Sequence, residues 1–150
     1  MQKESKIFVP EIITTRIFKY PRNTVFHAWS DPQLLAQWWG PKGFSNAFHV
    51  FEFKVGGQWK FTMHAPDGTT YANEFRFIKI ESPDKIILEH LEPIHTFKVT
   101  ATFEELNNST RLSFIMQFDL LSEYEKLKDF IAIANEENFD RLENVLLNQK

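Results

Sequence analysis

The sequence predicts an α+β fold in which a curved, seven-stranded antiparallel sheet surrounds one long C-terminal helix. Short segments of alternating apolar and polar residues, separated by turn signals, fill the middle of the chain, as is typical of an antiparallel sheet with one buried face. Apolar residues at helical spacing fill residues 123–147. Two short helical segments are expected directly after the first strand.

The composition favours a soluble, single-domain protein. Of the 150 residues, we expect 1–10 to be a flexible lead-in and 11–150 to form one domain. The chain has no Cys, which excludes disulfides and thiolate metal sites and is compatible with a cytoplasmic location. We expect no signal peptide and no membrane span, because the apolar runs are too short. The net charge of −3, spread along the chain, argues against nucleic-acid binding.

The first strand and the two short helices are expected in the first third of the chain. Residues 11–20 are rich in Ile, Thr and Phe, which favours a strand that ends at Pro21. Residues 24–29 have helical spacing, and Asp31-Pro32 offers an N-cap acceptor and a first-turn proline for a second helix. Gly40-Pro41 ends that helix. Helices of about two turns are not stable alone, so the sheet must hold them.

Six further strands and the long helix complete the chain. Turn signals such as Gly56-Gly57 separate the predicted strands, which occupy residues 44–55, 59–64, 71–80, 85–91, 97–104 and 112–118. Ser122 and Glu125 have the spacing of a capping box at the start of the last helix. A helix of about 25 residues is about 37 Å long, enough to cross a small domain.

The aromatic content raises the question of what the sheet encloses. Sixteen Phe, four Trp and three Tyr either fill an aromatic core or line an internal cavity. His49, Asn73 and His90 share the strand parity of apolar neighbours, so these three polar side chains are predicted to point inward. They would then pair with one another and the backbone, or contact a ligand. Exposure is the alternative, because bulges reverse strand parity.

Trp38-Trp39 is the other candidate feature. Adjacent residues at a helix end point about 100° apart, so one ring can pack inward while the other reaches a rim. Either both rings belong to the core, or one gates a cavity mouth or forms a contact patch for another protein.

Catalytic and metal chemistry have little support in the sequence. The five histidines lack metal-ligand spacing, so we predict neither a metal site nor a cofactor. No Ser lies in a Gly-x-Ser-x-Gly motif, and Glu52, Glu74 and Glu104 fall on outward faces. We therefore predict no catalytic residues.

Several motifs carry a family resemblance. They are PRNTVFHAWSDP at residues 21–32, QWWGPKGF at 37–44, VGGQWKF at 55–61 and VTATFEE at 99–105. Together with RIF at residues 16–18 and weaker matches at 82–86 and 140–142, they span nearly the whole chain. On these motifs the chain resembles the activators of heat-shock-protein-90 ATPase, a family within the START-like (SRPBCC, birch-pollen-allergen-like) superfamily.

The resemblance implies a helix-grip fold with a cavity between the sheet and the C-terminal helix. Superfamily members often bind hydrophobic small molecules there, and some act as aromatases or cyclases, whereas the eukaryotic activator domain binds a chaperone. Two departures stand out: Phe75 replaces a Gly of many relatives, and Glu137-Asn138 replaces a Gly-Trp. Both sites are implied to lie near the cavity, so its shape should differ from that in relatives.

We therefore predict non-enzymatic binding of a hydrophobic or aromatic small molecule in that cavity. A co-chaperone-like protein-interaction module and a cyclase-, aromatase- or hydrolase-like enzyme are the alternatives, and both a monomer and a homodimer remain open. A cavity of roughly 300 Å³ or more would favour the small-molecule function over the protein-interaction one. The candidate lining residues are Trp38, Trp39, His49, Phe51, Phe53, Trp59, Phe61, Met63, Asn73, Phe75, Phe77, His90, Phe97, Phe114, Met116, Phe130 and Asn138.

Overall fold

The computed structural model of the chain describes residues 10–91 and 96–148. The elements in chain order are β1 (Glu11–Phe18), α1 (Arg22–Ser30), α2 (Pro32–Trp38), β2 (Ser45–Phe51), β3 (Gln58–His64), β4 (Thr70–Glu81), β5 (Lys85–His90), β6 (Phe97–Leu106), β7 (Ser109–Phe118) and α3 (Leu121–Leu147). The predicted order of one strand, two short helices, six strands and a long helix is confirmed. The lead-in predicted for residues 1–10 falls, apart from Pro10, outside the described residues.

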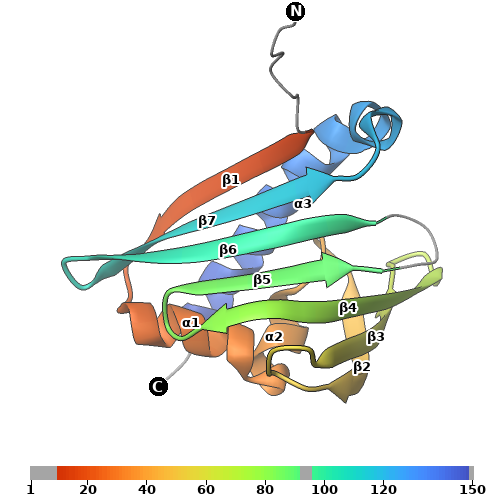
Figure 1. Cartoon of the computed structure of the whole chain (residues 1–150). Coiled ribbons are helices and arrows are strands. Elements are labelled where there is room, and N and C mark those ends of the chain that lie inside the picture. Colours follow the sequence, from red (N-terminus) through yellow and green to blue (C-terminus); the bar gives the residue numbers. More distant parts are fainter. Residues whose placement is uncertain (1–9, 92–95, 149–150) are drawn as a thin grey trace, which may run out of the picture.

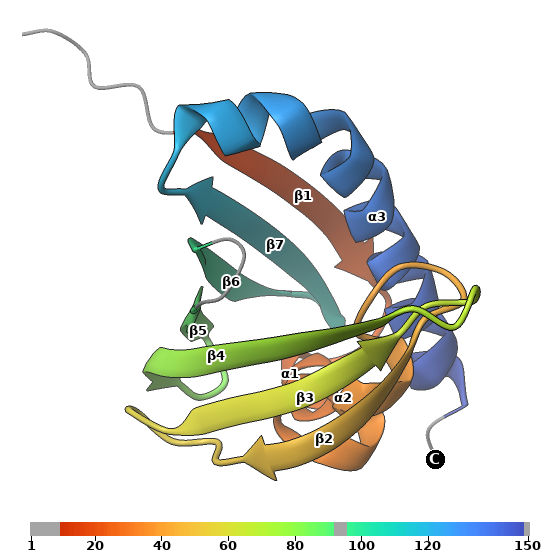
Figure 2. The ribbon, with the colours of Figure 1, turned by 90° about the vertical axis from the view of Figure 1, so that its right-hand side faces the viewer.

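The seven strands form one antiparallel sheet in the order β1-β7-β6-β5-β4-β3-β2 (Figure 1). Strands that are neighbours in the sheet follow one another along the chain, except that β1 pairs with β7. As a result β2, which follows α1 and α2, forms the edge opposite β1. Figure 2 shows the sheet bent into a trough, with α3 along its open side and the two short helices at one end. This arrangement leaves an interior between the concave face of the sheet and α3.

A capping residue explains where α2 begins, and a buried indole ties the two short helices together. The Asp31 carboxylate accepts a hydrogen bond from the Gln33 amide at 2.9 Å, and Pro32 is the first residue of α2, as predicted. The Trp38 indole is buried and donates to the Ala28 carbonyl at 3.0 Å. This bond ties α2 to α1 and satisfies the polar atom of a core ring.

The start of α3 differs from the prediction. The helix begins at Leu121 after Leu120, and no side chain makes a capping hydrogen bond there, so the capping box proposed for Ser122 and Glu125 is wrong. The reason is that β7 runs on to Phe118, and the chain enters the helix so soon that Ser122 already lies in its first turn.

The C-terminal half of α3 is held to β1 by a cluster of charges. The Arg16 guanidinium contacts Glu136 at 2.8 Å, Asp140 at 2.9 Å and Glu143 at 3.2 Å. Beneath this cluster the buried Phe139 ring packs edge-on against the rest of the core. The ion pairs and the buried ring together hold α3 across the open side of the sheet.

A β-bulge reverses the predicted orientation of His49. Phe48 pairs with Phe61 and Val50 with Lys60, so one extra residue lies between them on β2. His49 is consequently exposed on the outer face, where its Nε2 lies 2.8 Å from Thr62 Oγ1. The prediction that His49 points inward is therefore wrong.

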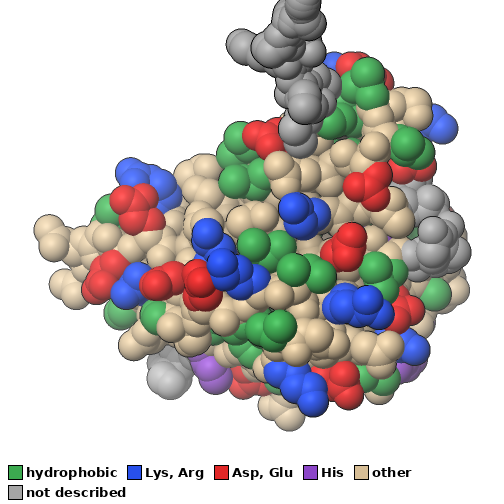
Figure 3. Space-filling model, in the orientation of Figure 1, with side chains coloured by type: hydrophobic (Ala, Val, Ile, Leu, Met, Phe, Trp, Pro, Cys, Tyr) green, Lys and Arg blue, Asp and Glu red, His purple; other side chains and the backbone are tan. Residues whose placement is uncertain are grey.

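The outer face of the sheet carries charges of both signs. Figure 3 shows Lys and Arg side chains interspersed with Asp and Glu on this face, with scattered apolar side chains between them. Among the described helices, none combines the length and apolar character needed to cross a membrane.

Candidate functional site

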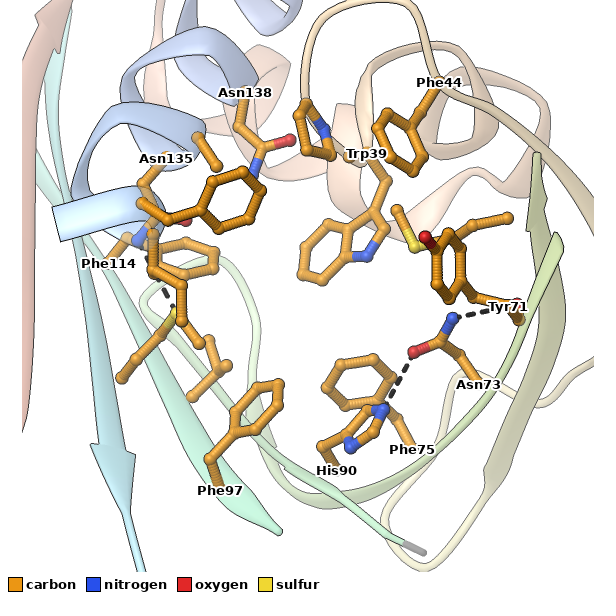
Figure 4. A pocket seen from close by; sticks show the side chains of 18 of the residues that line it. Trp39, Phe44, Tyr71, Asn73, Phe75, His90, Phe97, Phe114, Asn135 and Asn138 are labelled. Atoms are coloured by element: carbon orange, nitrogen blue, oxygen red, sulfur yellow. Dashed lines mark hydrogen bonds between the residues drawn. The ribbon is translucent and has the colours of Figure 1, made fainter. Parts of the chain in front are cut away.

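A cavity of about 390 Å³ lies between α3, the concave face of the sheet and the segment that follows α2 (Figure 4). Its lining comes from every layer of the fold and consists mainly of aromatic and aliphatic side chains. The lining residues are Trp39, Gly40, Pro41, Phe44, Met63, Tyr71, Ala72, Asn73, Phe75, His90, Phe97, Val99, Phe114, Met116, Phe130, Ile131, Ala134, Asn135 and Asn138.

The structure brings more than half of the predicted lining residues to this cavity. They are Trp39, Met63, Asn73, Phe75, His90, Phe97, Phe114, Met116, Phe130 and Asn138. Of the tryptophan pair, both rings are buried, and Trp39 is the one that lines the cavity. Phe75 and Asn138, the two departures from the family pattern, both lie in its wall.

The remaining predicted residues lie elsewhere. Apart from His49 on the outer face, they belong to an aromatic cluster at the β2–β4 side of the core: Trp38, Phe51, Phe53, Trp59, Phe61 and Phe77. Trp59 stacks on Phe61 with centroids 4.5 Å apart and on Phe75 at 5.2 Å. Trp38 lies on α2 itself, and the other rings face inward, where they pack against one another; Phe53 also packs against Phe26 of α1. They therefore fill the core and do not line the cavity.

Of the face that α3 turns to the cavity, sequence reasoning predicted Phe130 and Asn138 and missed Ile131, Ala134 and Asn135. Ile131, Ala134, Asn135 and Asn138 line it at positions i, i+3, i+4 and i+7, which is one stripe of a helix. That spacing is readable in the sequence and would have identified the stripe. Gly40, Pro41, Phe44, Tyr71, Ala72 and Val99 were also missed, and they come from a loop and from strand positions.

On the sheet side of the cavity, Asn73 and His90 are partners of each other. His90 Nε2 lies 2.8 Å from Asn73 Oδ1, which requires that Nε2 carry the proton. The Asn73 amide also donates to the Tyr71 carbonyl at 3.2 Å. The buried His90 ring stacks on Phe97 with centroids 4.7 Å apart. The two inward polar residues predicted on β4 and β5 thus form one hydrogen-bonded pair.

On the helix side, two buried amides face the cavity with weaker contacts. Asn135 Nδ2 donates to the Met116 sulfur at 3.5 Å, and a thioether is a weak acceptor. Asn138 Oδ1 is buried and has no hydrogen-bond partner among the residues that the structure describes. This wall therefore retains an unused capacity for hydrogen bonding.

One wall of the cavity is a loop that α3 holds in place. We call residues 37–44 the strap. Arg141 of α3 donates hydrogen bonds of 2.8 to 3.3 Å to four strap carbonyls, those of Gln37, Trp39, Gly40 and Pro41. Burial lowers the pKa of Arg141 from its ordinary value, but guanidinium remains charged at any physiological pH. The guanidinium thus fixes the loop that carries Trp39.

The chemistry of the cavity is that of an uncharged apolar site. Its described lining contains no Asp, Glu, Lys or Arg, and His90 and Tyr71 are the titratable residues there. Among the described residues, no group of three or more His, Cys, Asp or Glu is arranged to hold a metal ion. The arrangement is suited to enclosing an apolar molecule and offering it a few hydrogen-bonding groups.

Comparison with known proteins places the chain in a family. The sequence model of the family described as Activator of Hsp90 ATPase homolog 1-like protein matches residues 19–146. No curated protein matches the chain.

Solved structures agree on the fold. A protein from Arthrobacter aurescens is 26% identical with a TM-score of 0.86, and the match covers 93% of this chain and 87% of that one. A Staphylococcus epidermidis protein is 23% identical with a TM-score of 0.82, covering 98% and 94% of the two chains. For a Nitrosomonas europaea protein the identity is 19%, the TM-score 0.84 and the coverage 93% and 96%.

Most of the chain matches the family model, and the strand order, the curved sheet and the long C-terminal helix follow the helix-grip arrangement. The chain belongs to the Activator of Hsp90 ATPase homolog 1-like protein family.

Proposed function

We propose that this protein binds a hydrophobic or aromatic small molecule in the cavity between α3 and the sheet, without catalysing a reaction. The observation that carries the proposal is the cavity itself, about 390 Å³ in volume and lined mainly by aromatic and aliphatic side chains. Ligand sites in proteins usually have volumes of about 300–1,000 Å³ and apolar walls with a few polar groups. The cavity has these properties.

The energetics favour an apolar occupant. At about 30 Å³ per molecule in the liquid, the cavity corresponds to roughly a dozen waters. Most of its wall offers these waters no hydrogen bonds, because it is built from rings such as Phe75, Phe97 and Phe114. Replacing such water by apolar surface is favourable by about 25 cal/mol per Å² buried. Ring edges and faces around the space also favour an aromatic guest.

Binding is proposed in preference to catalysis because of how the polar groups are arranged. A cyclase- or hydrolase-like enzyme would need a pair of titratable groups that exchange a proton. His90 is instead hydrogen-bonded to the amide of Asn73, which does not titrate at physiological pH.

A cavity-filling substitution tests the proposal. N-phenyl-1-naphthylamine, an uncharged dye that fluoresces in apolar sites, is titrated into the protein and into two variants. Ala134 lies in the cavity wall, and Ala132 is exposed on the same helix. We expect Ala134→Phe to weaken dye binding at least about tenfold and Ala132→Phe to leave it unchanged, since only the first ring occupies the cavity. Equal dye binding by both variants, with melting curves that show both are folded, would contradict the proposal.

A second function, protein interaction of the co-chaperone type, is supported by apolar side chains exposed on α3. Phe130, which also lines the cavity, is 64% exposed, and Ile133 on the same helix is 63% exposed. Large exposed apolar side chains often mark contact sites. The test is the ATP turnover of a heat-shock-protein-90 chaperone with and without this protein. Stimulation that Phe130→Ser and Ile133→Ser abolish would support this function, and unchanged turnover would count against it.

We also propose a cytoplasmic location, with which the lack of Cys is compatible because disulfides form mainly in oxidising compartments outside the cytoplasm. Cell fractionation with an antibody against the protein tests it, and recovery outside the cytoplasmic fraction would contradict it.

A further inference from the structure

We infer that the ligand is an uncharged aromatic molecule that carries a hydroxyl group, and that this hydroxyl binds the side-chain amide of Asn138 on α3. The inference rests on the proposed binding function and specifies the chemistry that the same cavity selects.

The first argument is the unpaired amide of Asn138. The residue is 7% exposed, lies in the cavity wall and has an Oδ1 atom without a hydrogen-bond partner among the described residues. Nearly all buried polar atoms in proteins are paired, because an unpaired one loses its hydrogen bonds to water without replacement. A ligand that donates to Asn138 would remove this deficit. In the structure Oδ1 is closed off from the open space, so a ligand reaches it only when the amide rotates about its terminal torsion, which is broad for Asn.

The second argument is that Asn73 and His90 on the opposite wall already have hydrogen-bond partners. Figure 4 shows Asn73 and His90 across the cavity from Asn138. Asn73 Oδ1 is paired with His90, and Asn73 Nδ2 is paired with the Tyr71 carbonyl. The polar end of a ligand is therefore expected at α3, where Asn138 lies one turn from Asn135. Its apolar part then extends toward the sheet.

The third argument concerns charge. The described lining contains no Lys, Arg, Asp or Glu, so an ionised ligand would enter without a counter-ion. The nearest guanidinium on the helix, that of Arg141, donates instead to the strap carbonyls. A carboxylate is therefore excluded by its desolvation cost, while a neutral hydroxyl supplies the donor that Asn138 lacks.

The fourth argument concerns shape. The rings of Trp39, Phe75, Phe97 and Phe114 surround the space between the polar groups. These rings offer both faces and edges, and aromatic pairs gain from such contacts beyond the area that they bury. A ligand with a flat ring system fits this surround better than a flexible chain, which would lose conformational freedom on binding.

The experiment compares three probes with one biphenyl frame by isothermal titration calorimetry at neutral pH. 4-Phenylphenol carries a hydroxyl, 4-methoxybiphenyl replaces it by an ether without a donor, and biphenyl-4-carboxylate is charged. We expect the phenol to bind about five- to tenfold more tightly than the ether, from one buried hydrogen bond. The carboxylate should bind at least about tenfold more weakly than the ether.

A matched pair of variants assigns the preference to its residue. Asn138→Leu keeps the volume and removes the amide, so the phenol and the ether should bind it with equal affinity. Asn144→Leu changes an exposed Asn of the same helix and should keep the preference of the unmodified protein. The comparison of probes on the unmodified protein does not depend on either variant folding.

The outcomes separate this inference from the proposed function. If all three probes fail to bind at millimolar concentration, both are overturned. If the phenol and the ether bind the unmodified protein equally, or if Asn138→Leu keeps the preference for the phenol, the cavity binds aromatic molecules and the inference about Asn138 is wrong. Tightest binding of the carboxylate would also overturn it.

Discussion

Replacing Arg141 by Met should loosen the strap and lower the stability of the whole domain. The guanidinium donates four hydrogen bonds to the carbonyls of Gln37, Trp39, Gly40 and Pro41, at distances of 2.8 to 3.3 Å. Met retains an apolar stem of similar length but donates none of them. The substitution thus removes the hydrogen bonds and keeps most of the packing.

The size of the effect follows from these contacts. A hydrogen bond to a charged group contributes about 1.5–3 kcal/mol. Three of the four bonds share one nitrogen, and the freed carbonyls regain water once the strap moves, so the contributions do not add. We expect a loss of about 2–4 kcal/mol, which a domain with about 5–15 kcal/mol of stability survives.

Urea denaturation measures the change as a shift of the unfolding midpoint at unchanged slope. Arg76→Met is the matched control, because Arg76 is exposed on β4, and it should change the stability by less than about 0.5 kcal/mol. Hydrogen exchange should also speed up in the strap of the Arg141 variant. An Arg141 variant as stable as the control, with unchanged exchange, would refute the role assigned to this residue.

Three further substitutions test how the cavity walls are held. Gly40→Ala should lower the free energy of unfolding in urea by about 1–2 kcal/mol, because Gly40 has a φ of +101° and an added Cβ would lie 2.7 Å from Met63 Cε. An unchanged unfolding midpoint would contradict this strain. Phe139→Ala should cost about 3–5 kcal/mol, because the ring is fully buried under α3, and a loss below about 1 kcal/mol would mean that the site collapses freely. Arg16→Met should lower the free energy of unfolding by less, about 0.5–1.5 kcal/mol, because its partner carboxylates are largely exposed. This difference in stability from the unmodified protein should shrink in high salt. A difference that does not depend on salt would argue against ion pairing.

The strands could be predicted from the sequence because an antiparallel sheet with one solvent-exposed face requires apolar and polar residues to alternate along each strand. On β6, Val99, Ala101 and Phe103 are buried, while Lys98 and Glu104 are exposed, as their alternation predicts. The same logic located the inward pair on β4 and β5. It also yielded the order of the elements, since each strand is bounded by a recognisable turn.

Strand parity did not predict the lining of the cavity where a β-bulge or the packing of distant elements determines the position of a side chain. The extra residue at the β2 bulge turns His49 outward, and nothing in the local composition marks that bulge. Trp59, Phe61 and Phe77 do face inward, but they pack against one another and against Phe51. Alternation indicates which face a side chain occupies, whereas the packing of distant elements decides whether that face is filled or left open.

More of the residues that line the helix side of the cavity could have been predicted from the sequence. Ala134, Asn135 and Asn138 follow the helical period, and two polar residues within an otherwise apolar stripe are a recognisable signal. Their contact with Met116 and with the space beneath α3 depends on the rotation of the helix against the sheet. That rotation is set by long-range contacts such as those of Arg16 and Arg141.

The most direct test of the central claim is a crystal structure of the protein with 4-phenylphenol at saturating concentration. The account predicts density for the biphenyl frame inside the cavity, against Trp39, Phe97 and Phe114, with the hydroxyl oxygen within hydrogen-bonding distance of the Asn138 amide. An empty cavity at saturation, or a ligand bound only on the outer surface, would contradict the claim that this cavity is the binding site.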